Sequence, residues 1–465
     1  MLKIIFLLLM SGGIPVAMAM AGSALIYIWW SGGLPPFVVI HRMISGIDSF
    51  PLLAVPFFIL AGNLMNNAGI SNRIYNYALA LVGWMKGGLG HVNVVGSVIF
   101  AGMSGTAIAD AAGLGTIEIK AMKDHGYSTE FAVGVTAASA TLGPIIPPSL
   151  PFVIYAMMAN VSVGALFLAG LMPGLLLAAM MMITVSWFAY KNEWGGDVKF
   201  SSSRFGKALI ELGVVAAWPT VIYFLVHAGL QPQLTVLVAL VVLFAADRYF
   251  KFQAVLPIMT PVLLIGGMTT GLFTPTEGAI AASVWAMVLG LFWYHTLSLK
   301  MFVKISLDTV EMTATVMFIV AAASIFGWML TATGVTAAIA EWVLAFTKEA
   351  WVFLLLANLL MLFVGCFLEP TAAITILVPL LLPIATKLGI DPVHFGLVMV
   401  LNLMIGLLHP PMGMVLFVLA RVAKLSVERT TVAIIPWLIP LLVSLVILTY
   451  VPAIVLWLPR VMGFL

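Results

Sequence analysis

The chain has 465 residues, of which 63% are hydrophobic and only 8% are charged, and its formal net charge is +3. Soluble domains carry about 25% charged residues, so this composition excludes an ordinary soluble protein and is typical of a polytopic membrane protein. The basic residues are spread along the chain, which gives no indication of nucleic-acid binding. A single cysteine, Cys366, excludes an internal disulfide and a cysteine-rich metal site.

The first 190 residues contain apolar runs long enough to cross a bilayer as helices, separated by short polar stretches. Tyrosine, tryptophan and basic residues in one of these stretches indicate an amphipathic helix in the membrane interface. The elements predicted here are a span at about 4–30, a polar loop with His41, Arg42 and Asp48, a span at about 50–67, the interfacial helix 71–86, an irregular segment 88–123, a broken helix 130–158 and a span at about 161–190.

Two clusters of small residues and prolines interrupt the apolar segments of this half. One cluster is centred on Ser104 to Thr106, and the other runs from Gly143 to Pro148. Non-helical backbone at membrane depth persists only where it lines a cavity or is buried in protein. We therefore interpret 88–123 as a re-entrant hairpin that turns near Ser104 to Thr106, and 130–158 as a helix broken at Gly143 to Pro148. A surface loop between two short spans is the alternative for either cluster taken alone.

The rest of the chain starts with a polar linker and then repeats this arrangement. Two helices of the linker region have no counterpart in the first half, so 191–254 is interpreted as a connecting insertion. The elements predicted are extra helices at about 208–229 and 233–249, spans at about 255–274, 277–295 and 309–331, an interfacial helix 335–347, a second hairpin 351–386 turning near Glu369 to Thr371, a helix 391–420 broken at Gly406 to Pro411, and a last span at about 430–457.

The two halves match at a nearly constant shift. Pro147-Pro148 recurs 263 residues later as Pro410-Pro411, and Gly126 recurs at the same shift as Gly389. Paired broken segments at corresponding places of two halves are the best indication of a transporter's substrate and ion site. We expect an all-α, elevator-type fold of about 11 transmembrane helices and two re-entrant hairpins, with inverted repeats at 1–190 and 255–465.

The distribution of lysine and arginine predicts the orientation. With the N-terminus in the cytoplasm, most of these residues fall in cytoplasmic loops, as the positive-inside rule requires. The first hairpin then opens to the cytoplasm, the second opens to the periplasm, and the C-terminus is periplasmic. If each hairpin were instead a full span, the loops after it would change sides, and lysine and arginine would no longer be concentrated in the cytoplasmic loops.

The hairpin turns and helix breaks suggest an ion-coupled site for an anionic substrate. Helix N-termini attract anions, and unwound carbonyls with hydroxyls suit Na⁺, which prefers oxygen ligands. We predict Na⁺ ligands at Ser104, Gly143, Ile146 and Pro147 for one site and at Thr371, Gly406 and His409 for a second. A carboxylated substrate is predicted between the turns, near Ser104, Gly105, Thr106, Ser149, Pro370, Thr371, Met412 and Gly413.

Three acidic residues within the predicted spans are candidates for coupling. Carboxylates in membrane segments are functional-site hypotheses by default, and these are Asp110, Glu277 and Glu369. Helix capping and interhelical hydrogen bonding are the alternative roles for Asp110 and Glu277. His409 lies inside a break, where it could contact the substrate or simply pack as a hydrogen-bonded side chain.

An enzymatic interpretation rests on one short match. Gly102-Met103-Ser104-Gly105 fits the Gly-x-Ser-Gly of rhomboid-type intramembrane proteases, in which a histidine activates the serine. The matched place in the second half has no serine, and no histidine lies at a clear helical spacing on a neighbouring span. No nucleotide-binding loop or zinc-protease motif occurs either. We predict that the chain is not an enzyme and that an ion gradient or a partner drives transport.

Several motifs together resemble the large membrane subunit of TRAP (tripartite ATP-independent periplasmic) transporters, over essentially the whole chain. This resemblance implies a Na⁺-driven importer of the bacterial inner membrane, in which a mobile domain holding both hairpins moves against a scaffold. The motifs are Gly62 to Gly69, Gly87-Gly88-Leu89, 100–105 (Phe-Ala-Gly-Met-Ser-Gly), 143–149 (Gly-Pro-Ile-Ile-Pro-Pro-Ser), 273–277 (Phe-Thr-Pro-Thr-Glu) and 389–396 (Gly-Ile-Asp-Pro-Val-His-Phe-Gly).

The resemblance also implies partners and a class of substrate. The partners are a small four-span membrane subunit and a periplasmic binding protein, and the usual substrates are C4-dicarboxylates, sugar acids and 2-oxo acids. Glu369 stands where many members carry aspartate, and His409 stands where threonine is commoner, so the second Na⁺ site departs from the family pattern. A Na⁺/dicarboxylate symporter that needs no binding protein, with the same hairpin architecture, is the alternative.

Overall fold

The computed structural model describes residues 1–227, 232–252, 254–269, 273–409 and 413–465, without the side chains of 219 and 222–237. The described part is built from helices, and apart from an isolated bridge between Lys86 and Gly196 it contains no strand pairing. These findings confirm the predicted all-α, multi-pass membrane fold. Six described helical stretches are long and apolar enough to cross a membrane: Phe50–Asn67, Val163–Lys191, Pro275–Trp293, Leu299–Ala332, Pro370–Lys387 and Val427–Tyr450.

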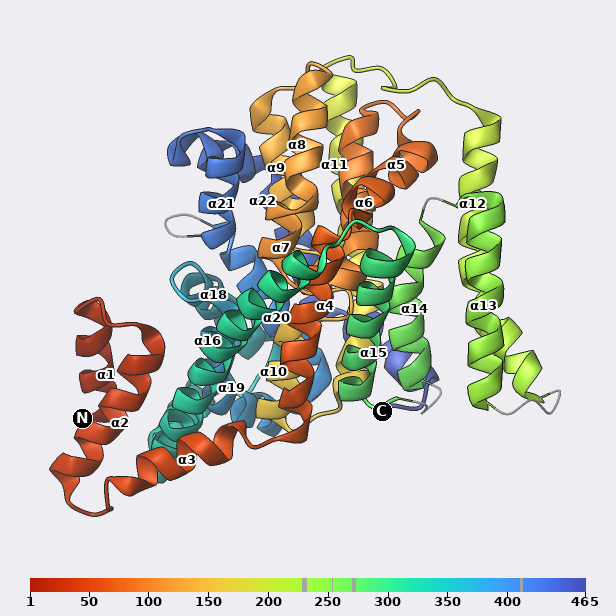
Figure 1. Cartoon of the computed structure of the whole chain (residues 1–465). Helices are drawn as coiled ribbons and strands as arrows, with labels where there is room; N and C mark the ends of the chain where they lie inside the picture. Colours follow the sequence, from red (N-terminus) through yellow and green to blue (C-terminus); the bar gives the residue numbers. More distant parts are fainter. Residues whose placement is uncertain (228–231, 253, 270–272, 410–412) are drawn as a thin grey trace.

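The N-terminal region differs from the prediction of one span followed by a loop. It forms two helices, α1 (Leu2–Ser11) and α2 (Val16–Ser31), which pack side by side at the edge of the molecule (Figure 1). Gly12 and Gly13 end the first helix, and Pro15, which lacks a backbone N–H, precedes the second. The predicted polar loop is α3 (Phe37–Ile47), and α2 and α3 both pack against the long helix α16 (Leu299–Ala332).

The rest of the first half alternates helices with short irregular segments. Between α9 and α10, residues 141–149 are non-helical and fully buried. Serine side chains accept hydrogen bonds from backbone N–H groups at the starts of α9, α10 and α11, as N-cap residues do. The helices are α4 (Ala54–Asn67), α5 (Ile70–Val82), α6 (Gly88–Ser104), α7 (Ala107–Ala112), α8 (Leu114–Asp124), α9 (Thr129–Ala140), α10 (Leu150–Ala159) and α11 (Val163–Lys191).

The second half repeats this alternation after the connecting helices. Between α20 and α21 the described backbone is non-helical at 407–409 and at Gly413. The predicted last span is interrupted before Pro452, so it comprises two helices. The elements are α12 (Ser202–His227), α13 (Pro232–Phe250), α14 (Val255–Thr269), α15 (Pro275–Met287), the π-helical turn η2 (Val288–Trp293), α16, α17 (Val335–Phe346), α18 (Ala350–Gly365), α19 (Pro370–Lys387), α20 (Pro392–Gly406), α21 (Met414–Ala423), α22 (Val427–Tyr450) and α23 (Pro452–Val461).

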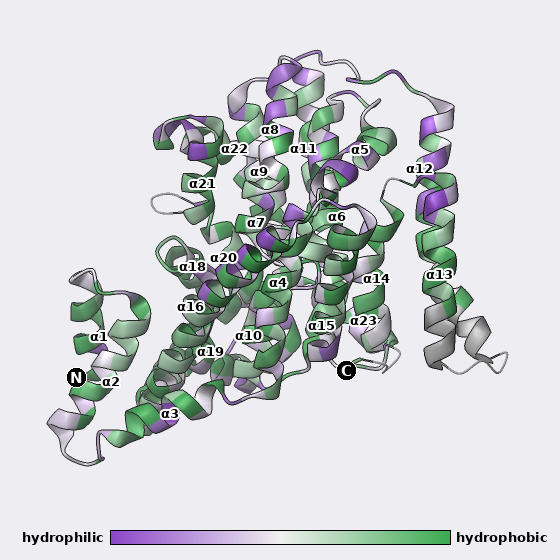
Figure 2. Cartoon of the chain, viewed as in Figure 1, coloured by the Kyte–Doolittle hydropathy of each residue, from purple (hydrophilic) through white to green (hydrophobic). Residues whose placement is uncertain are grey.

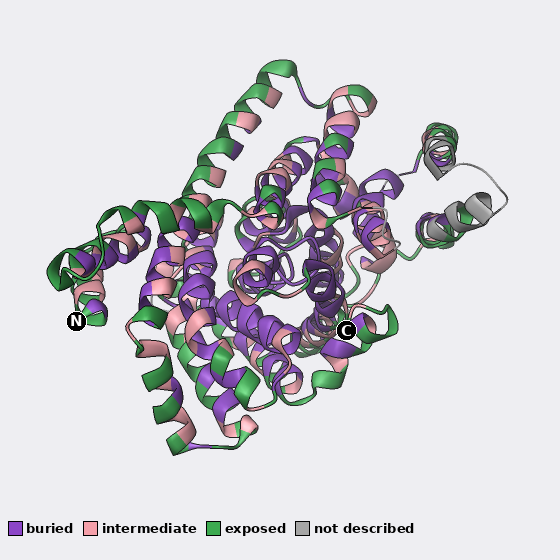
Figure 3. Cartoon of the chain, turned by 90° about the horizontal axis from the view of Figure 1, so that it is seen from below, coloured by how far each residue is buried: buried purple, intermediate pink, exposed green. Residues whose placement is uncertain are grey.

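Buried residues gather in the centre of the molecule, and exposed residues lie mostly on the peripheral helices (Figure 3). The two helices that precede the breaks, α9 and α20, are buried over nearly their whole length. In Figure 1, α8 lies in the upper part of the molecule and α19 in the lower part, with α7 between them. The irregular residues 141–149, Leu407, Leu408 and Gly413 are likewise buried, so their backbone groups are shielded from lipid.

Tyr127, in the turn between α8 and α9, links this turn by a hydrogen bond to the segment that follows α11. Its hydroxyl donates to Asp197 at 2.6 Å, and Asp197 also accepts the backbone N–H of Leu89 at 2.7 Å. Burial and this hydrogen bond raise the pKa of Tyr127, so the phenol stays protonated and remains a donor at physiological pH.

We expect Tyr127→Phe to lower the free energy of unfolding by about 1.5–3 kcal/mol, because Asp197 loses a hydrogen bond to a charged acceptor. Thermal unfolding of the purified protein measures the effect. Tyr190→Phe is the matched control, since Tyr190 is 84% exposed. Equal melting temperatures for the two variants would contradict this role of Tyr127.

Candidate functional site

A cavity of about 570 Å³ lies where the two hairpin turns face helix α4. Both halves of the chain contribute to its wall, so it brings together segments far apart in the sequence. The residues from the first half include Asn63, Asn66, Asn67, Ser71, Asn72, Ser104, Thr106, Pro144, Leu150 and Pro151, and those from the second half include Met312, Glu369, Pro370, Thr371, Met404, Leu407 and Met414.

The turn between α6 and α7 lies directly against the first break. Gly105 has a φ of +64°, and a Cβ at this position would lie 2.9 Å from the carbonyl oxygen of Pro148. A Cβ on Gly143 would lie 3.1 Å from the carbonyl oxygen of Thr106. Glycine is therefore required at Gly105, and at Gly143 it avoids a tight contact. The Ser104 hydroxyl at this turn is buried and has no hydrogen-bond partner among the described residues.

The turn between α18 and α19 has a corresponding contact with the second break. Gly365 at the end of α18 meets Gly406 at the end of α20, backbone against backbone. Glu369 caps α19 by accepting the N–H of Ala372 at 3.2 Å, and it also accepts the Thr371 hydroxyl at 2.7 Å. The thiol of Cys366 lies 3.3 Å from Nδ1 of His409. The residues predicted for the second ion site thus lie close together.

Several helices begin at the cavity wall, among them three from the two breaks and the second turn. These three are α10, whose first residues Leu150 and Pro151 line the cavity, α19 with Pro370 and Thr371, and α21 with Met414. Helix N-termini carry partial positive charge and free N–H groups, so the cavity favours an anion. Among the described residues that line it, none is lysine, arginine or histidine.

Some predicted site residues lie behind the cavity wall. The Ser149 hydroxyl is fully used, because it donates to the Pro144 carbonyl and accepts the N–H of Phe152. Gly413 packs on the Leu407 carbonyl, and the Ile146 side chain packs against Gly174. Gly105 and Pro147 do not line the cavity either. Met412 lies outside the described residues.

Glu277 lies apart from the two turns. It forms a capping box with Thr274 at the exposed start of α15, where it accepts the Thr274 N–H at 2.7 Å. Such a box satisfies two N–H groups at a helix start, which corresponds to the capping alternative. A role of Glu277 in coupling has no support in this geometry.

Asp110 belongs to a buried polar cluster inside the first hairpin. The cluster comprises Asp110, which interacts with Ser97, together with Asn93, Glu118, Thr136 and Ser139. Asn93 donates to Glu118 at 2.6 Å and to Thr136 at 2.8 Å. One oxygen of Asp110 and one of Glu118 have no partner among the described residues. Asp110 was predicted from the sequence as a candidate for coupling, but the polar residues that surround it were not predicted.

The second half contains a smaller version of this cluster. Asn402 on α20 donates to Asn358 on α18 at 2.6 Å, and Asn358 donates to Thr449 on α22 at 3.0 Å. All three side chains are buried. This chain of hydrogen bonds joins the hairpin to the broken helix and to the following span.

We expect Asn402→Ala to lower the free energy of unfolding by about 1–3 kcal/mol, because the buried oxygen of Asn358 then loses its donor. Since the two residues form one network, the double variant Asn358→Leu/Asn402→Leu should cost less than the sum of the single variants. A double-mutant cycle on apparent melting temperatures tests this expectation. Strict additivity would show that the pair does not act as a unit.

The asparagines on the α4 and α5 side of the cavity were missed by the sequence analysis. Asn63, Asn66 and Asn67 lie three and four residues apart on α4, so they share a polar face of an otherwise apolar helix. Asn72 follows on α5, next to Ser71, whose buried hydroxyl has no partner among the described residues. These residues could have been found in the sequence, because polar residues at helical spacing inside an apolar segment indicate a polar helix face.

An all-helical membrane protein with broken helices and hairpin turns around a cavity lined by both halves of the chain has the architecture of a secondary transporter. Comparison with known proteins gives the family. The model of the tripartite ATP-independent periplasmic transporter, DctM component, matches residues 3–454, and the chain belongs to this family. It is therefore a transporter permease subunit and not an enzyme, which leaves no support for the protease alternative.

Two relatives and one solved structure illustrate the range of similarity. The chain is 40% identical to the sialic acid TRAP transporter large permease protein SiaM of Vibrio cholerae, over 97% of this chain and 96% of that protein. It is 33% identical to the C4-dicarboxylate TRAP transporter large permease protein DctM of Rhodobacter capsulatus, over 98% and 97% of the two chains. The crystal structure of the YdaH transporter of Alcanivorax borkumensis shares the fold, with a TM-score of 0.57 at 14% identity and coverage of 88% and 86%.

Proposed function

We propose that the chain imports a hydroxylated organic acid across the bacterial inner membrane, driven by a Na⁺ gradient. The observation that carries this proposal is the cavity between the two hairpin turns. Helix N-termini, among them those of α10, α19 and α21, line this cavity, and no described cationic side chain does. The substrate carboxylate would be held at these N-termini and turns, near Ser104, Thr106, Pro370 and Thr371.

The wall formed by α4 and α5 supports a sugar acid over a small dicarboxylate. Asn63, Asn66, Asn67 and Asn72 offer amide donors and acceptors that match hydroxyl and amide groups of a substrate. The second carboxylate of a dicarboxylate substrate would bind best to arginine or lysine, and neither lines the described part of the cavity. The 40% identity to a sialic acid permease agrees with this preference.

Na⁺ coupling is supported by oxygen atoms at the two turns. Ser104 has a buried hydroxyl without a partner among the described residues, and the next residue, Gly105, lies against the Pro148 carbonyl of the first break. Thr371 and Glu369 supply hydroxyl and carboxylate oxygen atoms at the second turn. Hard cations such as Na⁺ prefer ligands of this kind, and the turns are the only places where a described hairpin meets a helix break.

Family membership supports a small membrane subunit and a periplasmic binding protein as partners, the latter delivering the substrate. With the N-terminus in the cytoplasm, the first hairpin would open inward and the second outward. Movement of both hairpins together past α4 and α16 would then expose the cavity to each side in turn, as in an elevator mechanism.

Uptake into proteoliposomes that hold this chain and its small partner tests the proposal. The binding protein is added with radiolabelled sialic acid or succinate, under an inward Na⁺ gradient or an inward proton gradient. We expect uptake of the sugar acid that requires both Na⁺ and the binding protein. Uptake without the binding protein would favour a partner-independent symporter, and equal uptake in Na⁺-free buffer would refute Na⁺ coupling.

A further inference from the structure

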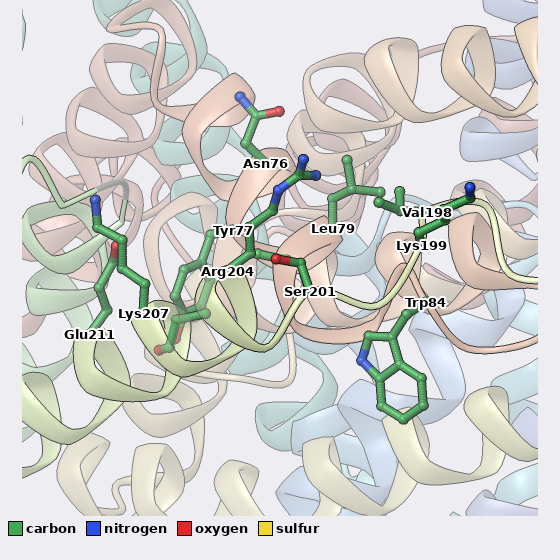
Figure 4. A pocket seen from close by; sticks show the side chains of 12 residues that line it. Asn76, Tyr77, Leu79, Trp84, Val198, Lys199, Ser201, Arg204, Lys207 and Glu211 are labelled. Carbon is green, nitrogen blue, oxygen red and sulfur yellow. The ribbon is translucent and has the colours of Figure 1, made fainter.

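A second cavity lies between α5 and the start of α12. Unlike the cavity at the hairpin turns, it is lined by basic side chains. We name it the basic pocket. Its volume is about 270 Å³. Figure 4 shows Lys199, Arg204 and Lys207 around it, with the Ser201 hydroxyl between them and Asn76 on the opposite side. The residues that line it are Asn76, Tyr77, Leu79, Ala80, Trp84, Val198, Lys199, Ser201, Arg204, Lys207, Ala208 and Glu211.

The basic pocket carries a net positive charge. Its lining side chains hold three cations and one carboxylate, that of Glu211. Glu211 is buried and accepts the backbone N–H of Ala254 at 3.0 Å, so its charge is directed toward the start of α14. Lys199 and Arg204 are exposed and come from the segment that enters α12. Arginine and lysine with hydroxyl and amide donors form a site suited to a phosphate group.

The surroundings of the basic pocket indicate a lipid. Leu209, Ile210 and Leu212, which follow the basic residues on α12, are large exposed apolar side chains. Figure 2 shows the same change along α12, from hydrophilic residues near its start to hydrophobic residues farther on. A cationic end followed by an apolar exposed face matches a phospholipid, whose charged headgroup is joined to acyl chains.

Aromatic side chains at the basic pocket indicate its depth in the membrane. Trp84 lines the basic pocket, and its ring lies 5.2 Å from that of Phe200 and 6.4 Å from that of Phe205. Tryptophan is enriched where hydrocarbon meets headgroups. The basic pocket therefore lies at headgroup depth, with the apolar face of α12 extending toward the hydrocarbon.

We propose that the basic pocket binds the phosphate of an anionic phospholipid, such as phosphatidylglycerol. Lys199 and Arg204 bind the phosphate, Ser201 and Asn76 bind the glycerol headgroup, and the acyl chains lie along α12. Lys207, whose Nζ donates to the Lys251 carbonyl at 3.3 Å, adds positive charge beside the phosphate. The lipid would then join α5, which leads into the first hairpin, to the connecting helix α12. This inference depends on the membrane location of the chain and not on its substrate or coupling ion.

Lipid retention by the purified full-length chain, with and without its small partner, tests the proposal by native mass spectrometry. The variant Lys199→Gln/Arg204→Gln removes two cations, and Lys300→Gln/Lys304→Gln removes two from an exposed part of α16 as the matched control. We expect the first variant to lose about 30-fold in apparent affinity for phosphatidylglycerol relative to phosphatidylcholine, and the control to lose none. Asn76→Trp, which fills the pocket without changing its charge, should lose phosphatidylglycerol as well.

Thermal unfolding of the wild-type chain separates the possible sources of the phosphate. Stabilisation by phosphatidylglycerol, but not by inorganic phosphate or phosphatidylcholine, supports a lipid site. Equal stabilisation by inorganic phosphate would overturn it in favour of a soluble anion. Equal phosphatidylglycerol retention by the wild type and both pocket variants would also overturn it, as would loss of the lipid whenever the small partner is present.

Discussion

We expect Ser104→Ala to raise the Na⁺ concentration for half-maximal uptake by about 10- to 150-fold. Ser104 is 5% exposed, its hydroxyl has no partner among the described residues, and it lines the cavity together with Pro144 of the first break. A buried hydroxyl without a partner is costly, so a ligand that satisfies it when bound explains its presence. Losing one interaction with a charged group costs about 1.5–3 kcal/mol, which corresponds to the stated change in affinity.

The measurement is the Na⁺ dependence of uptake into proteoliposomes at saturating loaded binding protein. Ser444→Ala is the matched control, because the Ser444 hydroxyl is equally buried but is satisfied within its own helix by the carbonyl of Pro440 at 2.7 Å. The same half-saturating Na⁺ concentration in Ser104→Ala and in the wild type would remove Ser104 from the ion site. A weaker substrate affinity at unchanged Na⁺ dependence would make it a substrate contact only.

The helix breaks were readable from the sequence because glycine and proline determine the backbone directly. Gly143 to Pro148 fall between α9 and α10, and Gly406 ends α20, in the stretches where breaks were predicted. The N-terminal region shows the limit of this reasoning. Residues 4–30 have the composition of one span, and only the packing of α1 and α2 on each other and on α16 shows that Gly12 to Pro15 separates two helices.

Part of the site could not be predicted, because it depends on contacts between distant segments. The sequence selects Ser104 and Thr371 as residues at turns, but it does not show that α4 brings Asn63, Asn66 and Asn67 to the same cavity. It likewise gives Glu369 as a candidate for coupling, but it does not show that this residue caps α19 and accepts the Thr371 hydroxyl. Composition and spacing locate irregular backbone, and tertiary packing decides which polar side chains face it.

The second large effect is expected at the contact between α18 and α20. A Cβ added to Gly406 would lie 2.6 Å from the Cα and carbonyl carbon of Gly365. Real Cβ atoms do not approach backbone atoms so closely, and neither atom belongs to a side chain that can turn away. Gly406→Ala therefore forces the second hairpin away from its broken helix and disturbs Cys366 and His409, which follow the two glycines and whose Sγ and Nδ1 atoms lie 3.3 Å apart.

We expect Gly406→Ala to lower the stability of the protein by about 1–3 kcal/mol or more, as overpacking does, and to abolish Na⁺-dependent uptake. Gly213→Ala on α12 is the matched control, because a Cβ there meets no atom within 4 Å, and alanine in an exposed helix is neutral or stabilising. Apparent melting temperature and uptake are measured on both variants. If Gly406→Ala showed the same Na⁺-dependent uptake as the wild type, the second turn would not need this close contact. The second ion site would then not depend on the packing of α18 on α20.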